Sequence, residues 1–210
     1  MTVWALDLDG VLWTGRTAIP GSAEAVAHLR RQGHEVVFVT NNSFATIAEQ
    51  EAKLAEFGVD ATGAVVNSAR AAASLIQADE RVFVLGGPGI TEAVADVGAE
   101  VVSDLGTEPE SIEAVLVGLD WQLSYDRLRL ASQAVLAGAR FVGTNADSSY
   151  PTESGLFPGA GALVAAVAAA TGVEPVVAGK PEQPMAELVR SRYGGSGIMV
   201  GDRAETDGLF

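Results

Sequence analysis

The chain has 210 residues, of which 48% are hydrophobic, and its 13 basic and 27 acidic side chains give a formal net charge of −14. This composition excludes a disordered chain, and an acidic balance without a basic cluster argues against nucleic acid or an anionic membrane as a partner. The sequence contains no cysteine, which excludes disulfides and thiolate metal sites. Met1 leads into an apolar run without an export signal, so we expect a cytoplasmic protein.

Strand-like and helix-like segments alternate along the first 60 residues. Apolar runs at 3–6 and 35–40 predict strands, and the segments at 22–31 and 47–57 predict helices. Thr46 and Glu49 form a capping box at the start of the second helix. A βαβα order of this kind predicts a parallel sheet in a doubly wound α/β core.

A second α/β series follows, in which Leu128, Ala131 and Val135 share one face of an amphipathic helix. Its predicted elements are strands at 81–86, 114–119 and 141–144 and a helix at 124–137. The Ala-rich run at 160–170 is shorter than the roughly 20 residues of a membrane span, so it predicts a buried helix. From about residue 176 the pattern returns to a strand, a helix at 185–193 and a strand at 198–200. We therefore predict a core formed by residues 1–80 and 175–210, with a second α/β domain at 81–174 inserted between them.

Polar residues follow three of the predicted strands, where parallel sheets bind ligands at their carboxyl edge. They are Asp7 and Asp9 after the first strand, Thr40, Asn41 and Asn42 at the end of the second, and Asp202 after the strand at 198–200. Two neighbouring carboxylates need a compensating cation, and Mg²⁺ is a hard ion that favours carboxylate oxygens. Lys180 adds a positive charge, so the pattern predicts phosphoryl chemistry at a magnesium site.

Each of these motifs has a plainer interpretation when it stands alone. Asp7 and Asp9 fit a solvated turn, residues 40–42 fit a polar loop, and Lys180 fits a surface lysine. The functional interpretation is favoured because all the motifs end neighbouring strands of one predicted sheet.

With these motifs in this order, the chain resembles the haloacid dehalogenase superfamily of phosphatases. Asp7-Leu8-Asp9-Gly10-Val11 is similar to the nucleophile motif, and the other three motifs correspond to Thr40-Asn41-Asn42, to Lys180, and to Gly201-Asp202-Arg203 with Asp207. The insertion between the second and third motifs, together with Gly179-Lys180-Pro181, is similar to the nitrophenyl phosphatase, phosphoglycolate phosphatase and pyridoxal phosphatase branch. The resemblance implies a doubly wound, Rossmann-like core with an inserted α/β cap.

The resemblance also implies a role for each motif residue. Asp7 would be the nucleophile that forms an aspartyl phosphate, and Asp9 would be the general acid and then the general base. Mg²⁺ would be held by Asp7, by the backbone carbonyl of Asp9 and by Asp202, with Asp207 in the outer shell. The phosphoryl oxygens would be bound by Thr40, Asn41, Asn42 and Lys180.

A loop of the cap would select the substrate, and residues 144–151 are the candidate for it. Tyr150 is the predicted specificity residue, at a position where related pyridoxal phosphatases have a His, which argues against that substrate. Trp13 lies close enough to Asp9 in the sequence to line the pocket, whereas Trp121 fits a packing residue. Chains of the resembled family continue past the fourth motif with another strand and helices, so we expect a core that is truncated at its C-terminus.

We therefore expect a Mg²⁺-dependent phosphatase that acts on small-molecule phosphate monoesters. The alternatives are a non-catalytic protein that binds a phosphorylated metabolite and a phosphotransferase that uses the same aspartyl phosphate. Related capped phosphatases often dimerise through the cap, so a homodimer is left open.

Overall fold

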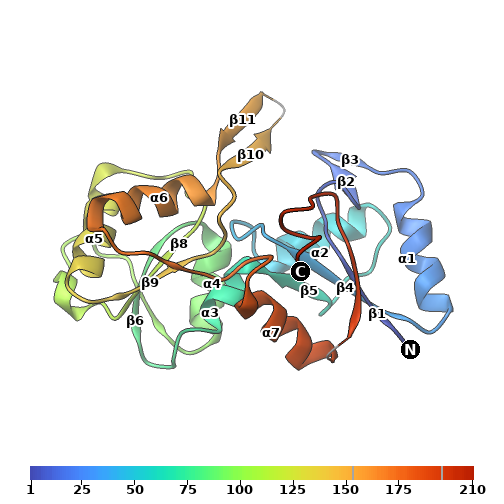
Figure 1. Cartoon of the computed structure of the whole chain (residues 1–210), viewed down its shortest axis with the longest axis horizontal. Coiled ribbons are helices and arrows are strands. Elements are labelled where there is room, and N and C mark those ends of the chain that lie inside the picture. Colours follow the sequence, from blue (N-terminus) through green and yellow to red (C-terminus); the bar gives the residue numbers. More distant parts are fainter. Residues whose placement is uncertain (153, 195) are drawn as a thin grey trace.

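The computed structural model describes residues 1–152, 154–194 and 196–210, and Figure 1 shows two lobes side by side, each built on its own sheet. The first sheet has four parallel strands in the order β13-β1-β4-β5. Its strands are β1 (Val3–Leu6), β4 (Glu35–Thr40), β5 (Val65–Asn67) and β13 (Gly197–Val200). The predicted α/β fold with a parallel sheet is confirmed.

Helices cover both faces of the first sheet. The helices are α1 (Ser22–Arg31) and α2 (Ile47–Glu56) on one face, and α3 (Ser68–Ala73) and α7 (Gln183–Tyr193) on the other. Along β4, Phe38 packs with the first pair, whereas Val37 and Val39 pack with the second pair. Successive side chains of a strand point to opposite faces, so a sheet covered on both sides needs this continuous apolar run.

The second sheet has five parallel strands in the order β12-β9-β8-β6-β7. Its strands are β6 (Arg81–Leu85), β7 (Glu100–Val102), β8 (Ala114–Val117), β9 (Arg140–Gly143) and β12 (Val176–Val177). Its own helices are α4 (Pro88–Asp96), α5 (Tyr125–Leu136) and α6 (Ala160–Thr171), with a short 3₁₀ helix at Pro109–Ser111. In the described ranges, no helix combines the length and apolar character that a membrane crossing requires.

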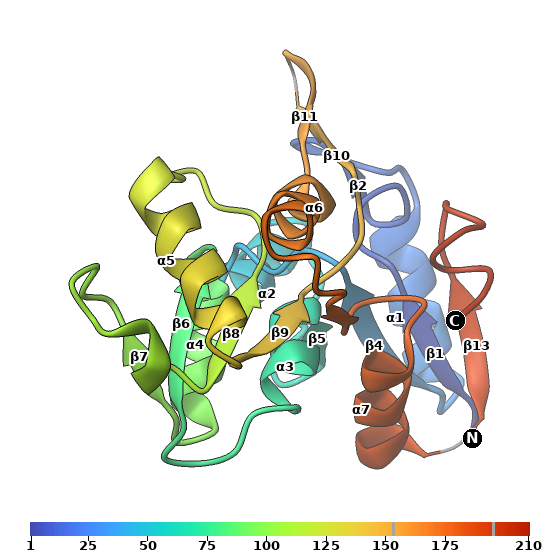
Figure 2. The ribbon, with the colours of Figure 1, turned by 60° about the vertical axis from the view of Figure 1, so that its left-hand side comes forward.

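Helix α3 lies between the two sheets (Figure 2). Its alanines are fully buried in one apolar cluster that contains Val37 and Val39 of the first sheet and Val82 and Val84 of the second. Alanine side chains let both sheets approach the helix closely. The two predicted domains therefore share a continuous core at their junction.

The pairing of β12 adjusts the predicted domain boundary. Val176 of β12 lies opposite Val142 of β9, so residues 176–177 belong to the second sheet, although the sequence analysis placed 175–210 in the core. With this change, the division into a core and an inserted cap stays a prediction.

Two antiparallel hairpins complete the fold, and Figure 1 shows both at the upper side of the molecule. They are β2 (Trp13–Thr14) with β3 (Thr17–Ala18), and β10 (Ser149–Thr152) with β11 (Gly155–Pro158). Tyr150 lies on a strand opposite Phe157, so the expectation of a loop at 144–151 is wrong for residues 149–151. A polar run that ends in Pro is typical of a loop, and only the pairing with residues 155–158 makes it an edge strand.

Candidate active site

Three strand ends of the first sheet meet at one edge. Leu6 of β1 lies beside Val200 of β13 and Phe38 of β4, so the residues at and after these strand ends are neighbours. The structure brings together Asp7, Thr40 and Asp202 in this way. They line a cavity of about 600 Å³ that also receives Asn145, Asp147 and Tyr150 from the segment after β9.

Lys180 lies between two buried carboxylates. Its Nζ donates to Asp7 Oδ1 at 2.8 Å and to Asp207 Oδ1 at 2.6 Å, and all three side chains are buried. Burial raises the pKa of Asp7 to about 6, against the lowering effect of the Lys180 ammonium. The reason is that removing a carboxylate from water disfavours its charged form. Lys180 is therefore a buried cation of the site and not a surface lysine.

Asp7, Asp202 and Asp207 form a donor set that fits a divalent cation. One carboxylate oxygen from each lies within 4.8 Å of the others, and the single nearby ammonium leaves the cluster with excess negative charge. Mg²⁺ takes oxygen ligands and usually combines one or two carboxylates with water and a substrate phosphate, so these donors suit it. Within the described residues, the Asp9 carboxylate lies outside this group. Binding of Mg²⁺ by the backbone carbonyl of Asp9 stays a prediction.

Two glycines give the acidic side chains the space they occupy. A Cβ at Gly10 would lie 2.2 Å from Asp202 Oδ2, and a Cβ at Gly201 would lie 2.1 Å from Asp207 Cγ. Gly10 also has a φ of +84°, in the left-handed region that favours glycine. The glycine of the Asp7-to-Val11 motif therefore helps to place an acidic residue nearly 200 positions away.

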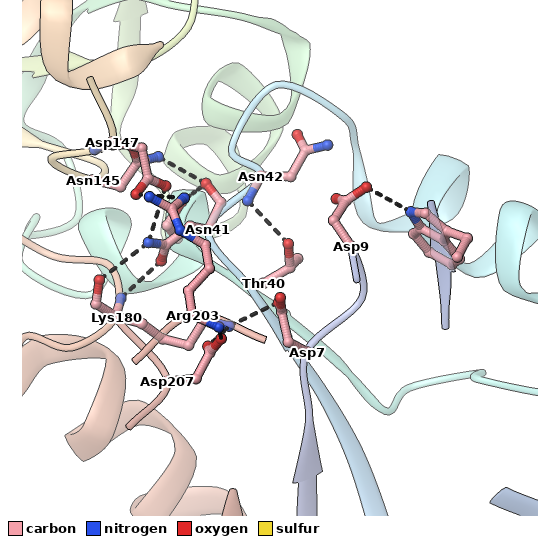
Figure 3. A network of polar contacts seen from close by, with 12 residues as sticks. Asp7, Asp9, Thr40, Asn41, Asn42, Asn145, Asp147, Lys180, Arg203 and Asp207 are labelled. Atoms are coloured by element: carbon pink, nitrogen blue, oxygen red, sulfur yellow. Dashed lines mark hydrogen bonds and ion pairs between the residues drawn. The ribbon is translucent and has the colours of Figure 1, made fainter. Parts of the chain in front are cut away.

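Asp9 faces away from the cluster of Asp7, Lys180 and Asp207. Its Oδ1 accepts a hydrogen bond from Trp13 Nε1 at 2.8 Å, and Figure 3 shows the carboxylate turned toward that donor. Asp9 lines the cavity, whereas Trp13 is not among the described residues that do. The expectation that Trp13 lines the pocket is therefore wrong, because the indole is buried behind Asp9.

Asn41 and Asn42 engage their side chains within the protein (Figure 3). Asn42 Oδ1 accepts from the backbone N–H of Phe44 at 3.0 Å, and the Asn42 N–H donates to Thr40 Oγ1 at 3.1 Å. The Asn41 amide bonds to the backbone of Lys180. Phosphate binding by Thr40, Asn41 and Asn42 stays a prediction, and the Thr40 hydroxyl and the backbone amides are the groups it concerns.

Residues that follow β9 connect the second sheet to the site. Asn145 Nδ2 donates to the Asn41 carbonyl oxygen at 2.8 Å, and Asn41 Nδ2 donates to Asp147 Oδ2 at 3.3 Å. Asp147 Oδ1 also forms an ion pair with Arg203 Nη1 at 3.2 Å. Loops of both sheets are therefore tied together beside the cavity.

Tyr150 lines the cavity and is supported by exposed aromatic rings. Its ring meets Trp121 edge-on with centroids 6.3 Å apart, and Trp121 makes similar contacts with Phe157 at 6.0 Å and Phe44 at 6.2 Å. The prediction that Trp121 is a packing residue is therefore confirmed, and since the side chain is 50% exposed, it packs at the surface beside the cavity and not in the core. Burial and the nearby Asp9 charge raise the pKa of Tyr150 above its ordinary value.

Lys53 and Arg16 are cavity residues that the sequence analysis did not identify. Lys53 lies on α2, and Arg16 lies in the turn between β2 and β3. The sequence contains only two lysines, Lys53 and Lys180, and both line the cavity. The small number of lysines is the sequence feature that could have identified Lys53 as a site residue. Together with Arg203 they supply local positive charge for an anionic substrate in a strongly acidic chain.

Comparisons with known proteins agree with this geometry. Residues 4–100 match the model of the family described as haloacid dehalogenase-like hydrolase. An acid sugar phosphatase from Staphylococcus haemolyticus is 37% identical over 211 residues, which cover 97% of this chain and 78% of the relative. The solved structure of a glycerol phosphate phosphatase from Mycobacterium tuberculosis, in complex with magnesium, is 35% identical with a TM-score of 0.90, covering 98% of this chain and 63% of that one. A p-nitrophenyl phosphatase from Archaeoglobus fulgidus is 29% identical with a TM-score of 0.91, covering 99% and 81%.

Proposed function

The chain belongs to the haloacid dehalogenase-like hydrolases, and on that premise we propose that it is a Mg²⁺-dependent phosphatase that forms an aspartyl phosphate on Asp7. The family resemblance inferred from the four motifs is thereby confirmed. The observation that carries the proposal is the placement of Lys180 Nζ, 2.8 Å from Asp7 and 2.6 Å from Asp207, beside the three-carboxylate donor set.

In the first proposed step, a carboxylate oxygen of Asp7 attacks phosphorus, and the bond between phosphorus and the ester oxygen breaks. Protonated Asp9 donates its proton to the departing oxygen, so that the product leaves as a neutral alcohol. Lys180 favours the ionised nucleophile and offsets the negative charge of the phosphoryl oxygens.

In the second proposed step, a water oxygen attacks the phosphorus of the aspartyl phosphate. Asp9, now a carboxylate, accepts the proton of that water. The bond between phosphorus and the Asp7 oxygen breaks, which releases inorganic phosphate and restores both aspartates to their starting states.

Asp7, Asp202 and Asp207 are the residues that would hold Mg²⁺, which when bound supplies positive charge against the repulsion between nucleophile and phosphoryl group. The magnesium complex of the M. tuberculosis phosphatase supports this choice of ion. The Thr40 hydroxyl and the backbone amides of residues 41–42 would orient the phosphoryl oxygens at the end of β4.

We further propose that the substrates are small phosphate monoesters with a sugar, polyol or aryl group. Three similar proteins, which are an acid sugar phosphatase, a glycerol phosphate phosphatase and a p-nitrophenyl phosphatase, support this range. A cavity of about 600 Å³ has room for such a group. Tyr150 and Asp147, which come from the segment after β9, would contact the part of the substrate beyond the phosphate.

The proposal is tested by phosphate release from 4-nitrophenyl phosphate with Mg²⁺ and with EDTA. Turnover should require Mg²⁺ and should be lost in Asp7→Asn. The matched control is Asp126→Asn, which makes the same chemical change at an exposed position on α5. Circular dichroism of each variant checks that the fold is retained.

A binding measurement and a product analysis with an added alcohol separate the two alternatives. Binding of phosphate esters without Mg²⁺-dependent turnover would favour the non-catalytic binding protein. Transfer of phosphate to an added alcohol, in preference to water, would favour the phosphotransferase. A homodimer through the second sheet stays a prediction, which sedimentation at increasing concentration checks.

A further inference from the structure

Asp9 is held at one oxygen by a buried indole. Trp13 Nε1 donates to Asp9 Oδ1 at 2.8 Å, and Trp13 is only 2% exposed. The backbone around these two residues is also held by hydrogen bonds. The Gly10 N–H donates to the Trp13 carbonyl at 2.7 Å, and the Leu12 N–H donates to the Leu8 carbonyl at 2.8 Å. The position of the indole relative to the carboxylate is therefore fixed by both backbone and side chain.

The indole is itself held by a cation and a second ring. Lys53 Nζ lies 4.0 Å from the centroid of the Trp13 ring, and the Phe57 ring lies 5.7 Å from it at a tilt of 43°. Lys53 Nζ also donates to the Gly15 carbonyl at 3.2 Å, which ties α2 to the β2–β3 turn. Burial lowers the pKa of Lys53, and the negative charge of Asp9 opposes this shift. The Lys53 ammonium is therefore close enough to act on both the indole and the carboxylate.

We propose that Trp13 is a positioning residue for Asp9 and that Lys53 holds the indole, so that together they direct the Asp9 proton toward the leaving group. The inference rests on the proposed function, because it takes Asp9 to be the general acid. It adds two residues outside the motifs that define the phosphatase.

The chemistry of the indole determines which oxygen of Asp9 carries the proton. An indole N–H is a donor and cannot accept a proton, so Asp9 Oδ1 must act as the acceptor of this bond. In the protonated form of Asp9, the proton then resides on Oδ2. Because the hydrogen bond restrains rotation of the carboxyl group, Oδ2 keeps one orientation at the border of the cavity, where a departing oxygen must come within hydrogen-bond reach.

Leaving-group dependence tests this inference. Phenolate is a much stronger base than 4-nitrophenolate, so phenyl phosphate needs general acid catalysis more than 4-nitrophenyl phosphate does, although the two esters are similar in shape. We expect Trp13→Phe to lower kcat/KM, which reports the steps up to formation of the aspartyl phosphate, by roughly 10- to 100-fold for phenyl phosphate and by less than about 3-fold for 4-nitrophenyl phosphate. The comparison uses kcat/KM because kcat also contains the second step, in which Asp9 acts as a base for both esters alike.

Two further variants make the test specific. Lys53→Met keeps the aliphatic stem and removes the charge. It should therefore change the ratio of kcat/KM for phenyl phosphate to kcat/KM for 4-nitrophenyl phosphate in the same direction as Trp13→Phe and by a smaller factor. Trp4→Phe is the matched control, because Trp4 Nε1 is buried without a hydrogen-bond partner in the described part of the chain. It removes an indole N–H that positions nothing, and the rate ratio should stay at its wild-type value.

An equal loss of kcat/KM for the two esters, or no loss, would overturn the inference. If Trp13→Phe fails to fold, the rate ratio of Lys53→Met decides the question alone. Asp9→Asn separates this inference from the proposed function: loss of turnover there, with unchanged rate ratios in Trp13→Phe and Lys53→Met, contradicts the inference only. A wild-type chain without Mg²⁺-dependent turnover of either ester contradicts both.

Discussion

The side-chain amide of Asn41 bonds to both backbone polar groups of Lys180. The Lys180 N–H donates to Asn41 Oδ1 at 2.8 Å, and Asn41 Nδ2 donates to the Lys180 carbonyl at 3.1 Å. The neighbouring Gly179 leaves room for this contact, since a Cβ there would lie 2.6 Å from Asn41 Oδ1. The end of β4 therefore holds the lysine that neutralises Asp7, although 139 residues separate the two positions in the sequence.

Removing the Asn41 amide should impair catalysis through Lys180. We expect Asn41→Ala to lower kcat/KM by roughly 10- to 100-fold, because a catalytic group held less precisely loses much of its effect. The measurement is the steady-state rate with Mg²⁺, combined with a thermal melt to confirm folding. An unchanged rate in a folded variant would contradict this role.

A double-mutant cycle with Lys180→Met identifies the route of the effect. If Asn41 acts by positioning Lys180, the loss in the double variant should be close to the loss in Lys180→Met alone. If the two losses multiply, Asn41 acts independently, which would favour the direct phosphate contact that the sequence motif suggests.

The raised pKa of Asp7 predicts a pH-dependent stability of the metal-free protein. Because the folded-state pKa is about 6 and the ordinary value is 3.8, the folded protein holds this proton more tightly than the unfolded chain does. The contribution of Asp7 to stability is therefore greatest below about pH 3.8, declines as the pH rises through this window, and is constant above about pH 6. Burial of the ionised carboxylate is the cause.

Asp7→Asn removes the titrating carboxyl group, so the difference in stability between this variant and the wild type isolates the pH-dependent contribution of Asp7. In EDTA, the free energy of unfolding of Asp7→Asn should rise relative to that of the wild type by roughly 1 to 3 kcal/mol as the pH increases from about 3.8 to about 6. Urea unfolding at a series of pH values measures the difference. A difference that stays constant with pH would contradict the raised pKa.

The close packing of Gly10 against Asp202 predicts a specific loss of metal binding. Gly10→Ala should displace the Asp202 carboxylate, because the added Cβ would lie 2.2 Å from its Oδ2. Mg²⁺ that binds the folded state raises the melting temperature by mass action. We expect this rise in the wild type and its loss in Gly10→Ala.

Gly21→Ala is the matched control for this prediction. Gly21 has a φ of +86°, close to the +84° of Gly10, but a Cβ there would meet nothing within 4 Å. Both substitutions carry a similar backbone strain, of about 1 kcal/mol, and only one of them reaches Asp202. Loss of the Mg²⁺ effect in both variants would show that the strain, and not the contact, is responsible.

The sequence predicts those features of the site that follow from the geometry of a parallel sheet. Asp7, Thr40 and Asp202 each stand at the end of an apolar run, and parallel strands bring such ends to one edge. The same reasoning predicts the α/β fold and the helices on both faces of the first sheet. Local signals also suffice at the start of α2, where Thr46 and Glu49 form the predicted capping box.

The features that sequence reasoning missed depend on contacts between distant segments. The partners of the Asn41 side chain, Asp147 and Lys180, lie more than 100 residues away, and no spacing rule relates them. Tyr150 becomes part of a strand only through pairing with Phe157. Lys53 reaches the cavity because α2 packs beside strand β2, which carries Trp13, and this is a tertiary relationship.

The edge-on contact between Trp121 and Tyr150 predicts an effect on substrate binding. Aromatic pairs of this kind contribute about 0.5 to 1.5 kcal/mol, so loss of the Trp121 ring should raise KM for 4-nitrophenyl phosphate by roughly 2- to 10-fold. The chemical step should be little affected, because Trp121 is not among the described residues that line the cavity. We therefore expect Trp121→Ala to change kcat by less than about 2-fold.

Tyr125→Ala is the matched control, since Tyr125 is an aromatic residue near Trp121 in the sequence and is 81% exposed at the start of α5. Its removal should leave both constants at their wild-type values. Steady-state kinetics on the three proteins make the comparison. A fall in kcat without a change in KM, or the same change in Tyr125→Ala, would show that Trp121 does not act by supporting Tyr150. A rise in KM confined to Trp121→Ala would mean that a half-exposed ring outside the cavity adjusts how tightly the segment after β9 holds the substrate.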